Sequence, residues 1–238
     1  MEEFLREYYG LLTKSVEVIA AIVAIIVYKK YRNTSVKFFL WFLIYVAFVE
    51  LIGNYPRYVY EYDYLKPLKE FLSGTFFKQN YWWYNIFWTI ASAVFYSFYF
   101  IKILKTKRFK VIIKICVALF FISVILKIAI DFKALFNSLI VFNTVFGASI
   151  IIICTILYFM EVLKSEKILT FYRSINFFIA TIIFIWFLVV TPLVFYNVYF
   201  SKDDWDFIIL KSVIILSMNV FMYLTFSFAL LWCKPQNV

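Results

Sequence analysis

Hydrophobic residues run along the chain in seven long stretches, and short polar segments separate most of them. A segment of about 20 apolar residues crosses a bilayer as an α-helix, because every backbone N–H and C=O is then hydrogen bonded within the segment. The pattern therefore predicts seven transmembrane helices. We place them at about residues 10–28, 36–54, 81–103, 110–131, 136–161, 172–197 and 207–232.

The composition supports this interpretation. Hydrophobic residues make up 65% of the 238 positions and charged residues 16%, whereas a soluble domain has about 45–50% and about 25%. Seven helices use most of the chain, and the loops that remain are too short for a further domain of ordinary size. We expect residues 1–238 to form one all-α membrane domain, a polytopic helix bundle without a soluble domain.

The distribution of basic residues predicts the orientation. The first, third and fifth loops between helices, the adjoining helix ends and the C-terminal tail hold 14 of the 24 basic residues but only two acidic ones. Short basic loops stay in the cytoplasm, so we expect the N-terminus outside and the C-terminus inside. The cytoplasmic loops then include Lys105, Lys107, Arg108 and Lys110. Anionic lipid at this face accounts for the net charge of +10, and we expect no nucleic-acid partner.

The longest segment between two predicted spans, residues 55–80, has tyrosine at every second position from Tyr58 to Tyr64. Tyrosine and tryptophan are enriched where a membrane meets water, which favours an interfacial belt. The alternative is a short extended segment that lines the mouth of a pocket. The predicted belt continues at the start of the third span with Trp82, Trp83 and Trp88.

Polar residues within the spans gather in the half that we predict to be outer. Inserting an ionisable side chain at the centre of a membrane helix costs about 2.5–3.5 kcal/mol, so each such residue is a candidate functional group. Both signs of charge are present, and we expect at least one salt bridge between helices, with Glu17 or Glu50 as the acid. As alternatives, Lys127 reaches the outer surface and Asn143 makes an ordinary interhelical hydrogen bond. The candidate pocket residues are Glu17, Glu50, Asn54, Asn85, Lys127, Asn143 and Lys211.

Two further features concern helix packing. Pro192 lies within the sixth span, where it frees a backbone carbonyl and makes the helix a candidate hinge or a static kink. Small residues at Ala20 and Ala24, and again at residues 147–149, allow close helix approach. Such an approach occurs within one chain or between the subunits of a homo-oligomer.

The residue types exclude several kinds of catalytic chemistry. The chain has no histidine, which removes the commonest general base and the commonest metal ligand. Cys116, Cys154 and Cys233 lie in or beside apolar stretches without ligand spacing and are interpreted as packing residues. We name no pair of nucleophile and base. We therefore expect no enzyme activity, no metal and no cofactor.

Short motifs resemble a family of uncharacterised seven-helix membrane proteins from Bacteroidota-type genomes. The motifs are residues 50–54 (ELIGN), 84–87 (YNIF), 218–223 (MNVFMY) and 232–235 (WCKP). The family has no established activity. Its members lie beside signalling histidine kinases, so the resemblance favours a sensory role.

We expect a multi-pass protein of a bacterial inner membrane. The first functional hypothesis is a receptor or sensory module, with an outward-facing polar pocket and a separate cytoplasmic signalling partner. The second is a small-solute transporter or channel whose buried charges couple or select solutes. The third is an oligomeric effector that permeabilises the membrane, as in phage defence.

Overall fold

The computed structural model describes residues 2–165, 170–196 and 205–235, and within these ranges the chain folds into helices joined by loops, with no β-strand. The helices longer than eight residues are α1 (Glu2–Tyr31), α2 (Val36–Gly53), α6 (Ala91–Ile103), α7 (Lys107–Ile130), α9 (Val141–Leu163), α10 (Ile175–Tyr196) and α11 (Trp205–Trp232). The shorter ones are α3 (Tyr55–Glu61), η1 (Asp63–Leu65), α4 (Lys66–Ser73), η2 (Phe76–Lys78), α5 (Tyr81–Trp83), η3 (Tyr84–Ile90), α8 (Ala134–Asn137) and η5 (Phe171–Arg173).

Among the described residues, seven helices are long and apolar enough to cross a membrane, as the hydropathy pattern predicts. The second of these spans continues from α2 into α3, and the third joins α5, η3 and α6 without a break. Outward-facing side chains are strongly apolar, which suits contact with lipid. On α7, for example, the exposed residues include Ile115, Leu119, Ile122 and Leu126.

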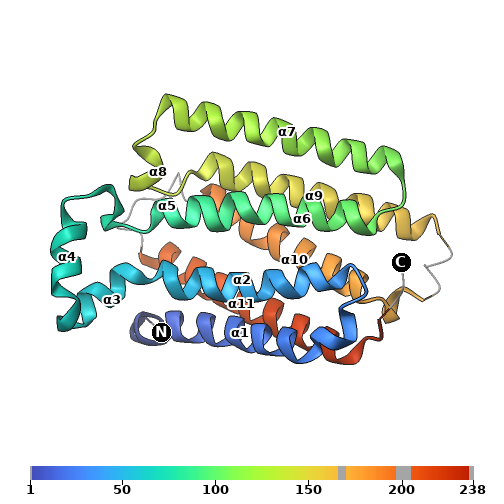
Figure 1. Ribbon diagram of the computed structural model, residues 1–238, viewed down its shortest axis with the longest axis horizontal. Helices are drawn as coiled ribbons and strands as arrows, with labels where there is room; N and C mark the ends of the chain where they lie inside the picture. Colours follow the sequence, from blue (N-terminus) through green and yellow to red (C-terminus); the bar gives the residue numbers. More distant parts are fainter. Residues whose placement is uncertain (1, 166–169, 197–204, 236–238) are drawn as a thin grey trace.

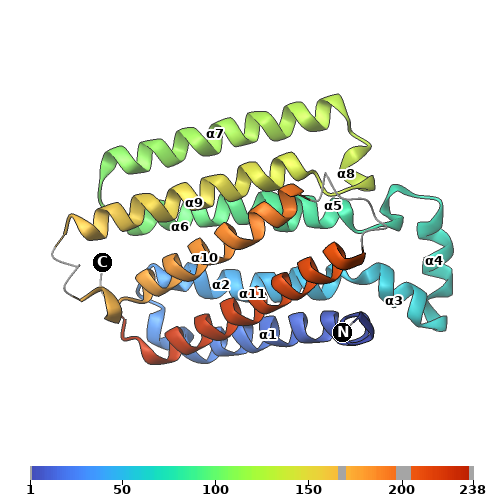
Figure 2. The ribbon, with the colours of Figure 1, turned by 180° about the vertical axis from the view of Figure 1, so that it is seen from behind.

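The spans lie side by side in one elongated bundle (Figure 1). The α4 end of the bundle carries residues 54–80 and 131–140, and the basic end carries residues 32–35, 104–106 and 170–174. α1 begins at the α4 end and α11 finishes at the basic end, so an odd number of passes separates the two termini. α1 packs on α2 and α11, α9 packs on α6 and α10, and α7 lies on the outside against α9. α10 and α11 slant relative to α1 and α9 (Figure 2).

Small residues allow the helices to approach closely within the chain. Ala20 and Ala24 on α1 are completely buried. A side chain at Gly147 of α9 would place its Cβ 3.3 Å from the Cβ of Ala93 on α6. Helices in lipid gain most of their association energy from such close packing. Both small-residue faces are therefore used inside this bundle.

At the basic end, side chains of α1 hold the last turn of α11. Lys30 Nζ donates hydrogen bonds to the carbonyls of Leu230 and Leu231 at 3.0 and 2.9 Å. Tyr31 Oη donates to the carbonyls of Leu230 and Cys233 at 3.1 and 2.7 Å. The final carbonyls of a helix have no partner within the helix, so these donors stabilise the end of α11 and fix α1 against it.

At the α4 end, one predicted boundary and one of the two alternatives for the tyrosine segment were wrong. The fifth span does not begin near residue 136, because residues 134–137 form the separate helix α8 and α9 begins only at Val141. The segment from Tyr58 to Tyr64 is not extended, because α3 and η1 occupy most of it. Its tyrosines at positions 60, 62 and 64 are exposed, as the belt interpretation expects.

Candidate ligand-binding cavity

A cavity of about 560 Å³ lies within the half of the bundle nearer the α4 end. Its walls come from α2, the third span, α9, α10, α11 and the loop between α8 and α9. Glu50 near the end of α2 and Lys211 near the start of α11 both line it, so two of the predicted pocket residues share one cavity. Both side chains are partly buried.

The π-helical segment η3 shapes one wall. A π-helix holds an extra residue in its turn and often occurs at functional sites. Tyr84, Trp88 and Thr89 of this segment line the cavity, together with Ser92 one turn further on. Asn85 faces a different neighbour and is described below. The π-helical turn thus places Tyr84 at the cavity and the neighbouring Asn85 against the chain between α8 and α9.

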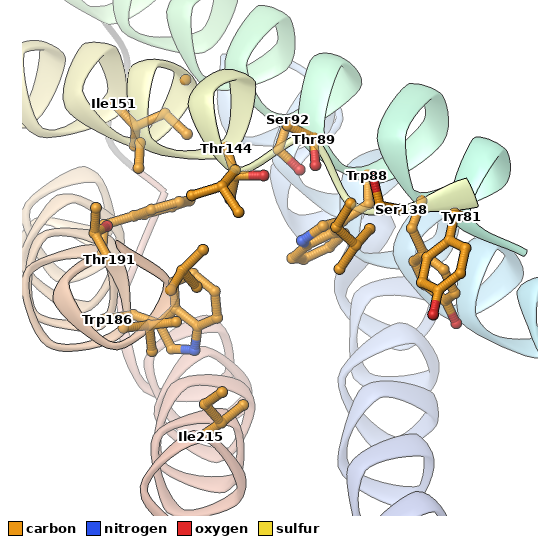
Figure 3. A pocket seen from close by; sticks show the side chains of 18 of the residues that line it. Tyr81, Trp88, Thr89, Ser92, Ser138, Thr144, Ile151, Trp186, Thr191 and Ile215 are labelled. Carbon is orange, nitrogen blue, oxygen red and sulfur yellow. The ribbon is translucent and has the colours of Figure 1, made fainter. Parts of the chain in front are cut away.

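The cavity combines hydroxyl groups with large aromatic rings (Figure 3). The side chains of Thr144, Ser92 and Thr89 lie on the same side of it, whereas Trp186 and Trp88 come from different walls. The Ser92 hydroxyl oxygen is buried and has no hydrogen-bond partner among the described residues. Buried polar groups nearly always have a partner, so this hydroxyl is suited to bond a ligand or water.

Glu50 is fixed in the cavity wall by aromatic side chains of the third span. Tyr84 Oη donates a hydrogen bond to Glu50 Oε2 at 2.9 Å. Trp83 Nε1 donates to the Val49 carbonyl at 2.9 Å. The close approach requires glycine at position 53, because a Cβ there would lie 2.9 Å from both Trp83 Cδ1 and Tyr84 Oη. The end of α2 and the start of the third span are therefore locked together.

Aromatic rings in edge-to-face contact fill the bundle between the cavity and the basic end. Phe187 of the cavity wall meets Tyr96 with ring centroids 6.1 Å apart, and Tyr96 meets Phe42 at 5.0 Å. Phe39 and Phe226 form the next contact at 4.8 Å, and both are completely or almost completely buried. We call Phe39, Phe42, Tyr96, Phe187 and Phe226 the aromatic layer. It lies between the cavity and the basic end.

Glu17 lies behind the cavity wall and not in the wall itself. It is only 4% exposed on α1, and its Oε2 has no hydrogen-bond partner among the described residues. Its charge interacts with those of Glu50 and Lys14. The expected interhelical salt bridge among Glu17, Glu50, Lys127 and Lys211 stays a prediction.

Asn85 is a structural clamp. Its Nδ2 donates hydrogen bonds to the carbonyls of Leu135 and Ser138 at 3.0 and 2.9 Å, and its Oδ1 accepts one from the Ile140 amide at 3.0 Å. These bonds hold the chain between α8 and α9 in a non-helical path, which explains why the fifth span starts late. Because Ser138 lines the cavity, Asn85 shapes the cavity without lining it.

The structure assigns the remaining candidates to other places. Lys127 is exposed on α7, and its Nζ lies 5.3 Å from the ring centroid of Phe142. Its reach to the outer membrane surface stays a prediction. Asn54 joins α2 to α3. Asn143 is buried, and its Oδ1 has no hydrogen-bond partner among the described residues. Asn219 differs, because it accepts a hydrogen bond from Trp186 Nε1 at 2.9 Å.

Pro192 lies within a continuous helix α10, next to the cavity residue Thr191. Its proposed role as a hinge stays a prediction. The structure also corrects the interpretation of Trp88, which lines the cavity although the sequence suggested an interfacial position. Sequence reasoning missed Ser92, Thr144 and Trp186 as well, because hydroxyl and aromatic residues are common in this chain and their spacing gave no specific pattern.

The basic loop before α7 is anchored by a carboxylate of α9. Glu161 accepts hydrogen bonds from the backbone amides of Lys105 and Thr106, the shortest at 2.8 Å. A second cavity of about 430 Å³ lies here, lined in part by Lys105, Arg108 and Lys164. Lys107 is exposed and Lys110 partly so. The basic residues of this loop thus lie around the start of α7, which the hydrogen bonds to Glu161 hold in place.

The three cysteines form no disulfide. No group of three or more acidic, cysteine or histidine residues suited to a metal occurs in the described part of the chain. Searches of protein-family models, of curated proteins and of solved structures found no match to this chain. The resemblance to a family of seven-helix membrane proteins therefore stays a prediction.

Proposed function

We propose that this protein is a membrane receptor that binds a small amphipathic molecule in the cavity and signals through a separate protein at the basic end. The cavity of about 560 Å³, with the aromatic layer between it and the basic end, carries the proposal. Ligand sites commonly measure about 300–1,000 Å³ and combine apolar walls with a few polar groups. In this proposal the cavity ends at the aromatic layer, which suits binding better than continuous passage.

The proposed orientation puts the α4 end outside the cell. It is supported by the 14 basic residues near the opposite end of the bundle and in the tail, since short basic loops remain cytoplasmic. The cavity then takes its ligand from the outside. The basic end, with the loop that Glu161 anchors, is the surface that a cytoplasmic signalling partner would contact.

The walls indicate what kind of molecule fits. Glu50 and Lys211 offer opposite charges, Trp88 and Trp186 offer large apolar faces, and Ser92 offers an unpartnered hydroxyl. Such a set suits a molecule with an aromatic or branched apolar body and at least one polar or charged group. Aromatic faces also attract cationic groups, so amines and zwitterions belong in the first panel of ligands.

A cavity-filling variant tests the proposal. The protein in nanodiscs is titrated with aromatic acids, amines and zwitterions, and binding is followed by tryptophan fluorescence and by thermal unfolding. The Thr144→Phe variant should lose binding of any ligand found, because the new ring occupies the cavity. The Ile153→Phe variant is the control, since Ile153 lies on the same helix but is exposed. Binding that Thr144→Phe leaves unchanged would contradict the proposal.

Transport is the second candidate, and the buried carboxylates Glu17 and Glu50 favour it, because intramembrane acids often mark solute or ion pathways. Protein in liposomes separates the two functions. A receptor binds a radiolabelled ligand without moving it into the lumen. Ligand uptake that the Glu50→Gln variant abolishes would instead establish a transporter. Nothing specific favours a pore-forming effector, since the small-residue faces at Ala24 and Gly147 are used inside the bundle.

A further inference from the structure

Glu50 on α2 lines the cavity, and a second carboxylate, Glu17 on α1, lies behind the cavity wall. Glu17 is 4% exposed, and Glu50 is partly buried and accepts a hydrogen bond from Tyr84. Their charges act on one another. Two ionised carboxylates that share a low-dielectric site repel, so such a pair requires a compensating positive charge or a shared proton.

The described neighbours of the pair are a lysine and several tyrosines. Lys14 of α1 supplies a positive charge that acts on both carboxylates, and its Nζ lies 3.3 Å from Tyr58 Oη. Among these groups, two negative charges face one positive charge. The carboxylates also act on Tyr9 of α1, Tyr84 of η3 and Tyr223 of α11, and Tyr84 donates its hydrogen bond to Glu50.

Two buried oxygen atoms without a hydrogen-bond donor among the described groups indicate the position of a compensating positive charge. Oε2 of Glu17 and Oγ1 of Thr13 are both buried and have no hydrogen-bond partner in the described part of the chain. The two residues are four positions apart on α1 and therefore lie on the same face of the helix. Buried oxygen atoms without a donor are rare in folded proteins. Carboxylate and hydroxyl oxygens are also the atoms that hold protons and hard cations.

We propose that Glu17 and Glu50 form a site for one exchangeable positive charge, carried by a proton or by Na⁺. The site neutralises the excess negative charge of the pair, with Thr13 Oγ1 and the Tyr84 hydroxyl beside it. Because Glu50 also lines the cavity, the bound charge lies at the boundary between the cavity and the packed helices α1 and α2. The site is defined without a cavity ligand, so its test does not depend on the receptor function.

The test uses the full chain in nanodiscs of neutral lipid without added ligand. Thermal unfolding is measured over a series of pH values, with NaCl or choline chloride at equal ionic strength. In parallel, infrared spectra in H₂O and D₂O are searched for the carbonyl stretch of a protonated carboxyl group. The Glu17→Gln variant removes the charge but keeps the shape. Glu61→Gln is the control, since Glu61 is an exposed carboxylate paired with Arg57 at 3.4 Å.

Two results support the site and distinguish its occupant. If the occupant is Na⁺, replacing choline by Na⁺ raises the unfolding midpoint of the wild type and of Glu61→Gln but not of Glu17→Gln. If it is a proton, a protonated carboxyl band appears in the wild type and is lost in Glu17→Gln. The unfolding midpoint then falls as pH rises, because the folded protein holds a proton that the unfolded chain releases.

A third result would overturn the site. A wild-type protein that shows neither a Na⁺ response nor a protonated carboxyl band has no such bound charge, whatever its variants do. A Na⁺ response or band that persists in Glu17→Gln equally rejects the assignment to this pair. If Glu17→Gln does not fold, Glu50→Gln replaces it in both measurements, with the same expected losses.

Discussion

The hydroxyl of Tyr84 donates a 2.9 Å hydrogen bond to Glu50, and this bond joins the π-helical part of the third span to the end of α2. Both residues line the cavity. The bond fixes one oxygen of the Glu50 carboxylate, which lies within a predicted membrane span. The other oxygen can still accept a hydrogen bond from a group in the cavity or near Glu17. The position of the only carboxylate described in the cavity wall thus depends on one tyrosine.

Replacing Tyr84 by phenylalanine should destabilise the protein through loss of this bond. A hydrogen bond to a charged group contributes about 1.5–3 kcal/mol, and we expect a loss of this size in reversible unfolding in bicelles. Tyr64→Phe is the matched control, because Tyr64 lies on the same end of the bundle and is 76% exposed. Equal losses for the two variants would show that the Tyr84 bond contributes nothing specific.

A methyl group at position 53 should force the two elements apart. The new Cβ of Gly53→Ala would lie 2.9 Å from Trp83 Cδ1 and from Tyr84 Oη. Overpacking of this kind costs about 1–3 kcal/mol, measured again by unfolding. Gly74→Ala is the control, since no atom lies within 4 Å of a Cβ at that position. A Gly53→Ala protein as stable as Gly74→Ala would mean that the rings move aside freely.

Removing the clamp at Asn85 should release the loop between α8 and α9. Asn85→Ala leaves the carbonyls of Leu135 and Ser138 without their donor. Each buried unpaired group costs about 1–3 kcal/mol. We expect lower stability and faster proteolysis in residues 134–140, whereas Asn33→Ala, an exposed position at the other end, changes neither. Unchanged proteolysis in Asn85→Ala would show that the loop keeps its path without the clamp.

The loop before α7 offers a fourth prediction, because Glu161 of α9 holds two of its backbone amides. Glu161→Ala removes the acceptor of the Lys105 and Thr106 amides, and loss of a hydrogen bond to a charged group costs about 1.5–3 kcal/mol. Glu61→Ala should cost less, about 0–1 kcal/mol, because it breaks only an exposed ion pair with Arg57. The reverse order in unfolding measurements would refute the anchoring role of Glu161.

Hydropathy was sufficient to locate the spans, because the bilayer demands long apolar helices whatever their packing. It did not locate the break before Val141, which depends on hydrogen bonds from Asn85 more than fifty residues earlier. Nor could it place Trp88, because a π-helical turn changes which residues of the third span face inward. Local rules could not anticipate either feature.

The candidate site was predictable only in part. Membrane depth correctly selected Glu50 and Lys211 as residues that line a cavity. Depth alone could not separate them from Lys127, which lies at similar height but on the lipid-facing side of a peripheral helix. The burial of Glu17 behind the wall likewise depends on how α1 packs against α2 and α11. Which way a helix face turns is decided by tertiary packing.

Cysteine accessibility shows whether the cavity opens to the outside and whether the aromatic layer closes it toward the basic end. The native Cys116, Cys154 and Cys233 are first replaced by alanine, and Thr144→Cys or Ser97→Cys is then introduced. Thr144 lines the cavity, whereas Ser97 is buried one residue beyond Tyr96 of the aromatic layer. A membrane-impermeant thiol reagent added to intact cells should label the Thr144→Cys variant and leave the Ser97→Cys variant unlabelled. Labelling of Thr144→Cys only after the cells are opened, or equal labelling of both variants from outside, would contradict the account.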